Sequence, residues 1–215
     1  GMVCHETYKD EDNNWISPDE ITTVNGKKFL KNDNSKQIKV GPSESMSKSK
    51  KNTIDPQNII DNYGADSVRL FILSDSPPEK DVQWSEQGML ASFKFIQKFW
   101  IINNQIKEKI QNSTTVSNQE GDLTLTKFTN QLVNKMNNNL EKFNYNVIIA
   151  NMHETYNFLT KIIDRKINKK VLIENYKKIL IIMSPVIPHI INECFEINKF
   201  DINQKWPSLD KTQLI

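Results

Sequence analysis

The chain has 215 residues, of which 37% are hydrophobic and 25% are charged. This length and composition suffice for one hydrophobic core or two small domains, and they exclude a wholly disordered chain. The net charge of +2 predicts no nucleic-acid partner by itself, so such a partner has to be argued from where the charges lie.

Only two cysteines are present, Cys4 and Cys194. Their separation fits neither a disulfide framework nor a zinc site, and we expect reduced thiols, a cytoplasmic location and no bound metal. No apolar run is long enough to cross a membrane. The first residues lack the basic and apolar segments of a signal peptide, and we expect the chain to be a fragment of a longer protein.

Residues 1–44 are rich in turn-forming residues and short of helical periodicity. Asn25-Gly26 between two short runs predicts a β-hairpin. We expect a small β-rich segment, inserted before the loop that follows, which buries little surface of its own and packs on another part of the protein. Cys4-His5-Glu6 would point to alternate faces of a strand, so we expect a structural strand here and not a metal site.

Residues 45–86 are predicted to hold a lysine-rich loop and two short helices. Asp55-Pro56 is typical of a helix start, and the N-terminus of this helix would favour an anion. Gly64 is typical of its end. A second helix is expected from Ala65 to the break at residues 76–78.

Apolar residues recur at steps of three and four through residues 87–200, which predicts amphipathic helices joined by short links. The expected fold class is mainly α, an antiparallel helical bundle preceded by the small β-rich segment and the loop. Residues 111–122 read as a polar link, and residues 201–215 as a C-terminal linker. We expect Trp84, Trp100 and Trp206 to be core anchors, and His189 to be a structural hydrogen-bonding residue.

The loop carries the pattern that points to chemistry. Residues 45–52 read Ser-Met-Ser-Lys-Ser-Lys-Lys-Asn. Lysines that alternate with small hydroxyl residues suit a polyphosphate, because ammonium groups neutralise its charge and hydroxyl and backbone N–H groups donate hydrogen bonds. A solvated loop has the same composition, and the pattern alone favours that interpretation.

A resemblance adds to this pattern. Met46-Ser47-Lys48-Ser49 resembles the KMSKS signature of class I aminoacyl-tRNA synthetases. The continuation through residues 50–56 is similar to the leucyl enzymes of bacterial type, whereas isoleucyl and valyl relatives usually continue with Leu-Gly-Asn. Further segments resemble the leucyl family: residues 1–8, Tyr63-Gly64-Ala65-Asp66, Arg69-Leu70-Phe71, residues 76–79, Trp84-Ser85, residues 185–190 and Trp206-Pro207. One departure is Ser45, where the signature has its first lysine.

The resemblance implies a leucine–tRNA ligase whose substrates are leucine, tRNA(Leu) and ATP with Mg²⁺. It implies that Met46, Ser47, Lys48 and Ser49 bind ATP and that Lys48 is catalytic, through charge stabilisation at the triphosphate. The nucleotide-binding fold with its HIGH motif and the editing domain of that family are not visible in the sequence. We therefore expect this chain to be inactive alone, and we expect a monomer.

A second group of basic residues lies in the predicted bundle. A solvated helix face has the same appearance, and the pattern alone favours neither reading. The resemblance implies that these residues contact the tRNA backbone. Such contacts recognise the shape of the tRNA and not its base sequence. The group comprises Lys161, Arg165, Lys166, Lys169 and Lys170.

Three alternatives stay open on the sequence. The first is another class I synthetase, isoleucyl or valyl, which Lys50-Lys51 and residues 76–79 disfavour. The second is a non-catalytic RNA-binding helical module. The third is a structural helical protein whose loop is inert.

Overall fold

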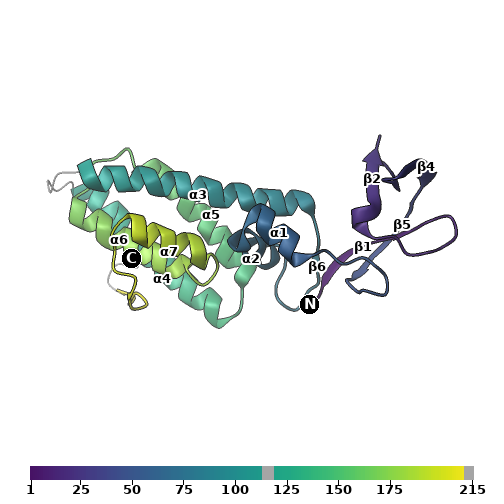
Figure 1. Cartoon of the computed structure of the whole chain (residues 1–215). Helices are drawn as coiled ribbons and strands as arrows, with labels where there is room; N and C mark the ends of the chain where they lie inside the picture. The colour runs from purple at the N-terminus through teal and green to yellow at the C-terminus, as the bar shows by residue number, and fades with distance from the viewer. Residues whose placement is uncertain (113–118, 211–215) are drawn as a thin grey trace.

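A computed structural model describes residues 1–112 and 119–210. Short strands lie at one end of an elongated molecule and a bundle of helices forms the other end, as Figure 1 shows. The expected fold class is therefore confirmed: the chain is mainly helical, and small sheets precede the bundle.

One sheet joins three segments that are far apart in the sequence. Strand β1 (Val3–Lys9) pairs antiparallel with β5 (Lys39–Ser45) and parallel with the short β6 (Val82–Gln83). The central strand is β1, so the order is β5-β1-β6. Residues that follow the first two helices thus return to the sheet from which the lysine-rich loop departs.

The second sheet is a three-stranded meander of β2 (Ile21–Val24), β3 (Lys27–Leu30) and β4 (Asp33–Gln37). A short 3-10 helix, Pro18–Glu20, precedes it. Asn25 and Gly26 form the predicted hairpin turn, with φ of 50° and 78°. Two positive φ values are what a two-residue type I′ turn requires.

The β-rich segment has a small core of its own. Three buried residues form it, and Ile21 and Leu30 pack against them. So few side chains supply little hydrophobic stabilisation, since each contributes about 1.5–3 kcal/mol. The three are Tyr8, Ile16 and Ile38.

Two short helices follow the loop. Helix α1 (Pro56–Tyr63) starts at the predicted proline, and helix α2 (Ala65–Ser74) starts directly after Gly64. Gly64 has φ 79° and ψ 153°, a conformation that essentially only glycine adopts. This residue therefore sets the corner between the two helices.

In the described part of the chain, the bundle contains five helices: α3 (Glu86–Asn112), α4 (Gln119–Glu141), α5 (Tyr145–Ile162), α6 (Lys169–Met183) and α7 (Pro188–Ile197). The polar link predicted for 111–122 is shorter than expected, because α3 extends to Asn112 and α4 begins at Gln119. Residues 113–118 of that link lie outside the described part of the chain.

One large hydrophobic core runs through the bundle, and Leu70 of α2 belongs to it. Helix α2 is thereby packed into the bundle, although only α1 separates it from the loop. Inside the core of the bundle, the buried Tyr176 of α6 donates its hydroxyl to Asn103 Oδ1 of α3 at 2.8 Å. Burial raises the pKa of the nearby Cys194 thiol to about 12, and both cysteines are free and buried.

The expectation that Trp206 is a core anchor was wrong. Its side chain is 41% exposed, and its indole N–H donates to Asn137 Oδ1 on α4 at 2.8 Å. The segment after α7 lies on the surface of α4, which explains the exposure. Trp84 and Trp100 are partly buried and pack against core clusters. Within the two described ranges, no helix is both long and apolar enough for a membrane span.

Candidate functional site

The lysine-rich loop, residues 46–54, begins where β5 ends. Ser45 is the last residue of that strand and is paired with Cys4 of β1. The next backbone N–H, that of Met46, donates to the carbonyl oxygen of Val3 at 3.1 Å. The loop therefore leaves from a fixed point at the end of the sheet.

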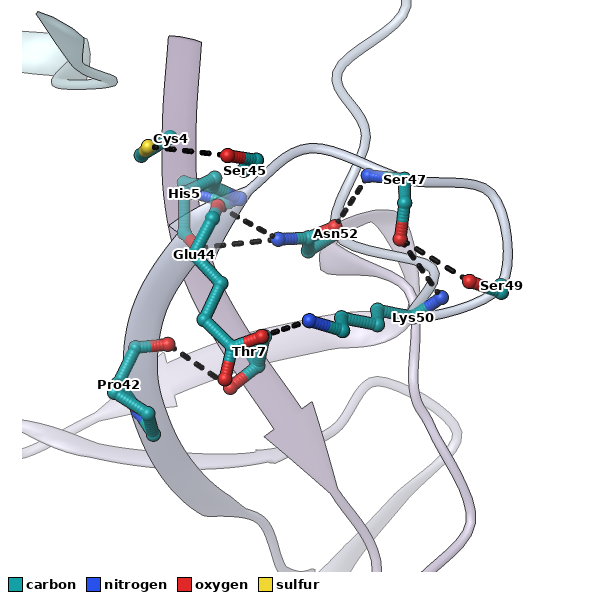
Figure 2. Close-up of polar contacts among 10 residues, drawn as sticks. All are labelled: Cys4, His5, Thr7, Pro42, Glu44, Ser45, Ser47, Ser49, Lys50 and Asn52. Carbon is teal, nitrogen blue, oxygen red and sulfur yellow. Dashed lines mark hydrogen bonds and ion pairs between the residues drawn. The ribbon is translucent and has the colours of Figure 1, made fainter. Parts of the chain in front are cut away.

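Asn52 holds the other end of the loop. It is 0% exposed, and Figure 2 shows its amide group reaching three backbone groups. Its Oδ1 accepts the Ser47 N–H at 2.8 Å, while its Nδ2 donates to the carbonyl oxygens of His5 and Glu44, each at 3.2 Å. One side chain thus ties the start and the end of the loop to β1 and β5.

The tip of the loop is a tight turn. The Lys51 N–H donates to the Lys48 carbonyl oxygen at 3.2 Å, and Lys51 has a positive φ of 51°. Below the tip, the Ser47 hydroxyl lies 3.2 Å from the Ser49 hydroxyl and accepts the Lys50 N–H at 3.4 Å. Lys48 and Ser49 are exposed at the tip, whereas Met46 and Ser47 are half-buried.

The three lysines of the loop differ in their partners. Lys50 forms an ion pair with Glu44 of β5, visible in Figure 2. Lys48 and Lys51 are exposed, and among the described residues neither has an ion-pair partner. Two ammonium groups are therefore free to neutralise an anion that approaches the tip.

The structure brings Met46, Ser47, Lys48 and Ser49 together in one loop, and their binding of ATP stays a prediction. Ser45 points its hydroxyl toward Cys4, with 4.0 Å between Oγ and Sγ, from the strand and not from the turn. The N-terminus of α1 is a poorer anion site than expected. Asp55 caps it with its own carboxylate, which accepts the Gln57 N–H at 2.9 Å.

A polar hollow of about 500 Å³ lies beside the base of the loop, between β1, β3 and the start of α3. Lys28 of β3 donates to Glu6 Oε2 at 3.1 Å and to the Tyr8 hydroxyl at 3.0 Å across it. Burial lowers the pKa of His5, which lines the same hollow. Residues 46–51 do not line it, so the loop tip is not part of this hollow. Among the described residues, no three His, Cys, Asp or Glu side chains form a group that could hold a metal.

The predicted basic group lies at the end of the bundle that is opposite to the strands, where α5 turns into α6 (Figure 1). Lys161 lies in the last turn of α5, Arg165 and Lys166 lie in the turn, and residues 169–170 begin α6. All five are close in sequence, and the structure adds Lys109 of α3, which sequence reasoning missed. The Lys109 ammonium donates to the Arg165 carbonyl oxygen at 2.7 Å.

The two lysines at the start of α6 oppose the helix dipole, whereas Lys161 lies in the last turn of α5, where the dipole favours a cation. The N-terminus of a helix carries a partial positive charge, which disfavours cations by about 0.3–1 kcal/mol each. Lys169 and Lys170 occupy the first turn of α6, where Asn168 is the N-cap. The helix dipole therefore does not account for lysine at these two positions.

Two family models match the chain. The model described as the anticodon-binding domain of tRNA ligase matches residues 122–214. The model described as tRNA synthetases class I (I, L, M and V) matches residues 38–85, which include the whole loop.

Curated relatives decide the family. The chain is 38% identical over 203 residues to the leucine–tRNA ligase of Bartonella henselae, an alignment that covers 90% of this chain and 23% of the relative. It is 36% identical over 221 residues to the leucine–tRNA ligase of Wolbachia pipientis subsp. Culex pipiens, covering 100% of this chain and 26% of the relative. The chain belongs to the leucine–tRNA ligase family. It spans about a quarter of the length of these relatives.

A solved structure supports the fold. The leucyl-tRNA synthetase of Agrobacterium radiobacter K84, crystallised as a ternary complex with tRNA and LeuAMS, superposes with a TM-score of 0.71. The match covers 80% of this chain and 23% of that chain at 20% sequence identity. Within the leucine–tRNA ligase family, this chain thus covers the end of the catalytic region and the anticodon-binding domain.

Proposed function

We propose that the chain works as part of a leucine–tRNA ligase, in which the loop binds the triphosphate of ATP and the bundle binds tRNA(Leu). The observation that carries this proposal is the arrangement of the loop: Asn52 fixes its two ends, and Lys48 stands exposed at its tip. A fixed base with a free cation at the tip suits an anion that enters from outside the described residues.

The proposed reaction begins with the activation of leucine. The leucine carboxylate attacks the α-phosphorus of ATP, which enters with Mg²⁺, and the bond to the β-phosphate breaks. Leucyl-adenylate forms and pyrophosphate leaves, so negative charge moves toward the leaving group. An ammonium group positioned there stabilises the transition state by about 3–4 kcal/mol, and we assign this role to Lys48. Met46, Ser47 and Ser49 complete the ATP-binding loop in this proposal.

The second half of the reaction transfers leucine from the adenylate to tRNA(Leu). We assign tRNA binding to the basic end of the bundle: Lys161, Arg165, Lys166, Lys169 and Lys170. A helix of 27 residues is about 40 Å long at about 1.5 Å per residue. Because α3 runs between the two sites, the loop and the basic end are too far apart to contact one small molecule. A long polyanion such as tRNA fits this separation.

The share of the relatives that this chain spans also bears on activity. About three quarters of the length of the relatives lies outside the segment that matches this chain. In this proposal, that part supplies the other walls of the nucleotide site. We therefore propose that the 215 residues alone catalyse no ATP–pyrophosphate exchange, and that the complete ligase is a cytoplasmic monomer.

A chimera tests the proposed function. The matching segment of the Bartonella henselae ligase is replaced by this chain, and leucine-dependent ATP–pyrophosphate exchange is measured for the chimera and for the isolated chain. We expect exchange from the chimera and none from the chain. A chimera with native circular dichroism and intact leucine binding that shows no exchange would contradict the proposal. Exchange by the isolated chain would contradict it as well.

A further inference from the structure

Helix α7 is capped by a residue from a distant helix. Its N-cap residue, Ile187, has no side chain that can cap. Asp66 of α2 takes that place: its carboxylate accepts the Ile190 N–H at 2.7 Å and the His189 N–H at 3.3 Å. The His189 ring adds a third contact, with 2.8 Å between Nδ1 and Asp66 Oδ1. His189 is therefore the structural hydrogen-bonding residue that we expected.

Arg69 donates hydrogen bonds to the turn that precedes the same helix. It lies three residues after Asp66 and thus on the same face of α2. Its Nε donates to the Val186 carbonyl oxygen at 3.0 Å, and its Nη2 donates to the Pro185 carbonyl oxygen at 2.7 Å. The carboxylate binds N–H groups of residues 189–190, and the guanidinium binds carbonyl groups of residues 185–186. We call Asp66, Arg69 and residues 185–190 the clasp.

The clasp has a short, stiff connection to the loop. Asn52, which holds the loop, is followed within four residues by the start of α1 at Pro56. Gly64 then sets the corner between α1 and α2, and the clasp begins at Asp66. The orientation of the loop relative to α6 and α7 therefore depends on how α2 is seated against the turn at residues 185–188.

Two kinds of contact seat α2. Leu70 is buried in the bundle core, and apolar contacts of this kind have no directional preference. The hydrogen bonds of Asp66 and Arg69 do have one, because the bidentate fork of a guanidinium and the two oxygens of a carboxylate each fix an angle. The buried Asp66, only 5% exposed, is thus placed to fix the orientation of α2 relative to α7.

We propose that Asp66 and Arg69 are positioning residues, which hold the loop in register with the RNA-binding bundle so that activated leucine meets the tRNA. This proposal rests on the proposed function. A displacement of about 1 Å between reacting groups costs about 100-fold in rate. Loss of the clasp should therefore lower transfer to tRNA more than it lowers leucine activation, which needs the loop but not the bundle.

The first test measures how the clasp orients α2 in the 215-residue chain, and it requires no enzymatic activity. Spin labels are attached to cysteines introduced at Asn58 on α1 and Lys178 on α6, both exposed, and the distance distribution between them is recorded. We expect Arg69→Leu to broaden the distribution and Arg69→Lys to broaden it less, while the helical circular dichroism is retained. Asp61→Asn on the exposed face of α1 is the control and should change nothing. An unchanged distribution in Arg69→Leu would overturn the proposal.

The second test uses the chimera. Arg69→Leu should lower the kcat of tRNA leucylation by about 10- to 100-fold and leave leucine-dependent exchange within about twofold of the parent. Asp66→Asn, which keeps one carbonyl oxygen as an acceptor, should show the same split at smaller size. Equal losses in both reactions, or no loss in either, would overturn the positioning role. If the parent chimera itself shows no exchange, the proposed function fails, and the distance measurement alone still decides whether the clasp orients α2.

Discussion

The side chain of Asn52 accepts the backbone N–H of Ser47 at 2.8 Å, and this bond closes the lysine-rich loop at its base. Buried asparagine is uncommon unless its polar groups are paired. Here both ends of the amide have partners, on the loop and on two strands. The base of the loop is therefore fixed on the sheet, as the proposed binding of a nucleotide at its tip requires.

Replacement of Asn52 by alanine tests this role. The change leaves the Ser47 N–H and two strand carbonyls without their partner, which costs about 1–3 kcal/mol for a buried polar group. We expect faster amide hydrogen exchange in residues 46–54, with the bundle helices unchanged. Thr53→Ala, at an exposed neighbouring position, is the control. Equal exchange rates in Asn52→Ala and in the unmodified chain would contradict the assignment.

The stability of the chain should decrease as the pH falls through the histidine range. Burial lowers the pKa of His5, and burial, aided by Lys98, lowers the pKa of His153. The folded state therefore binds fewer protons than the unfolded state between the lowered pKa and the ordinary value of 6.5. The contribution of these two histidines to the free energy of unfolding is fully present above pH 6.5 and is lost as the pH falls toward the lowered pKa values.

Urea unfolding at several pH values between about 5 and 8 measures this effect. The free energy of unfolding should be higher at the upper end. The double variant His5→Gln, His153→Gln should depend less on pH over the same interval. The same slope in the double variant would show that other groups cause the dependence.

Binding of tRNA should depend on the basic end of the bundle. The variant Arg165→Gln, Lys166→Gln, Lys170→Gln should weaken binding of the isolated chain to tRNA(Leu). It should also reduce the slope of log affinity against log salt by about 2–3, because each lost phosphate contact removes about 0.7–0.9. A matched triple variant elsewhere, Lys98→Gln, Lys142→Gln, Lys205→Gln, removes the same charge from exposed positions.

Titrations with tRNA(Leu) at several salt concentrations compare the two triple variants. The control variant should keep the original slope. If both variants weaken binding equally, net charge and not the basic end is responsible, and the assignment of these residues is wrong.

The helices could be predicted from the sequence because their signals are local. Steps of three and four apolar residues indicate each bundle helix, and Asp55-Pro56 and Gly64 mark the two ends of α1. The hairpin at Asn25-Gly26 was predictable for the same reason, since the turn requires two residues that tolerate positive φ.

Other features could not be predicted because they depend on partners far away in the sequence. Strand β6 has only two residues and exists because β1 offers an edge to it. Asp66 meets His189 across 123 residues, and no local pattern distinguishes it from a surface carboxylate. Trp206 was wrongly expected in the core, because an aromatic side chain alone does not show whether its segment is covered. Lys109 joins the basic end only through the packing of α3 against the α5–α6 turn.

Lys48 and Lys51 offer the most direct measurement, because both are exposed lysines of the same loop and only Lys48 is assigned to catalysis. In the chimera, leucine activation by pyrophosphate exchange is compared for Lys48→Ala and Lys51→Ala over a range of leucine concentrations. The account predicts that Lys48→Ala lowers kcat by about 100- to 1000-fold with little change in the KM for leucine, whereas Lys51→Ala lowers it by less than about tenfold. An unchanged kcat in Lys48→Ala, or equal losses in the two variants, would contradict the central claim that the Lys48 ammonium stabilises the transition state at the triphosphate.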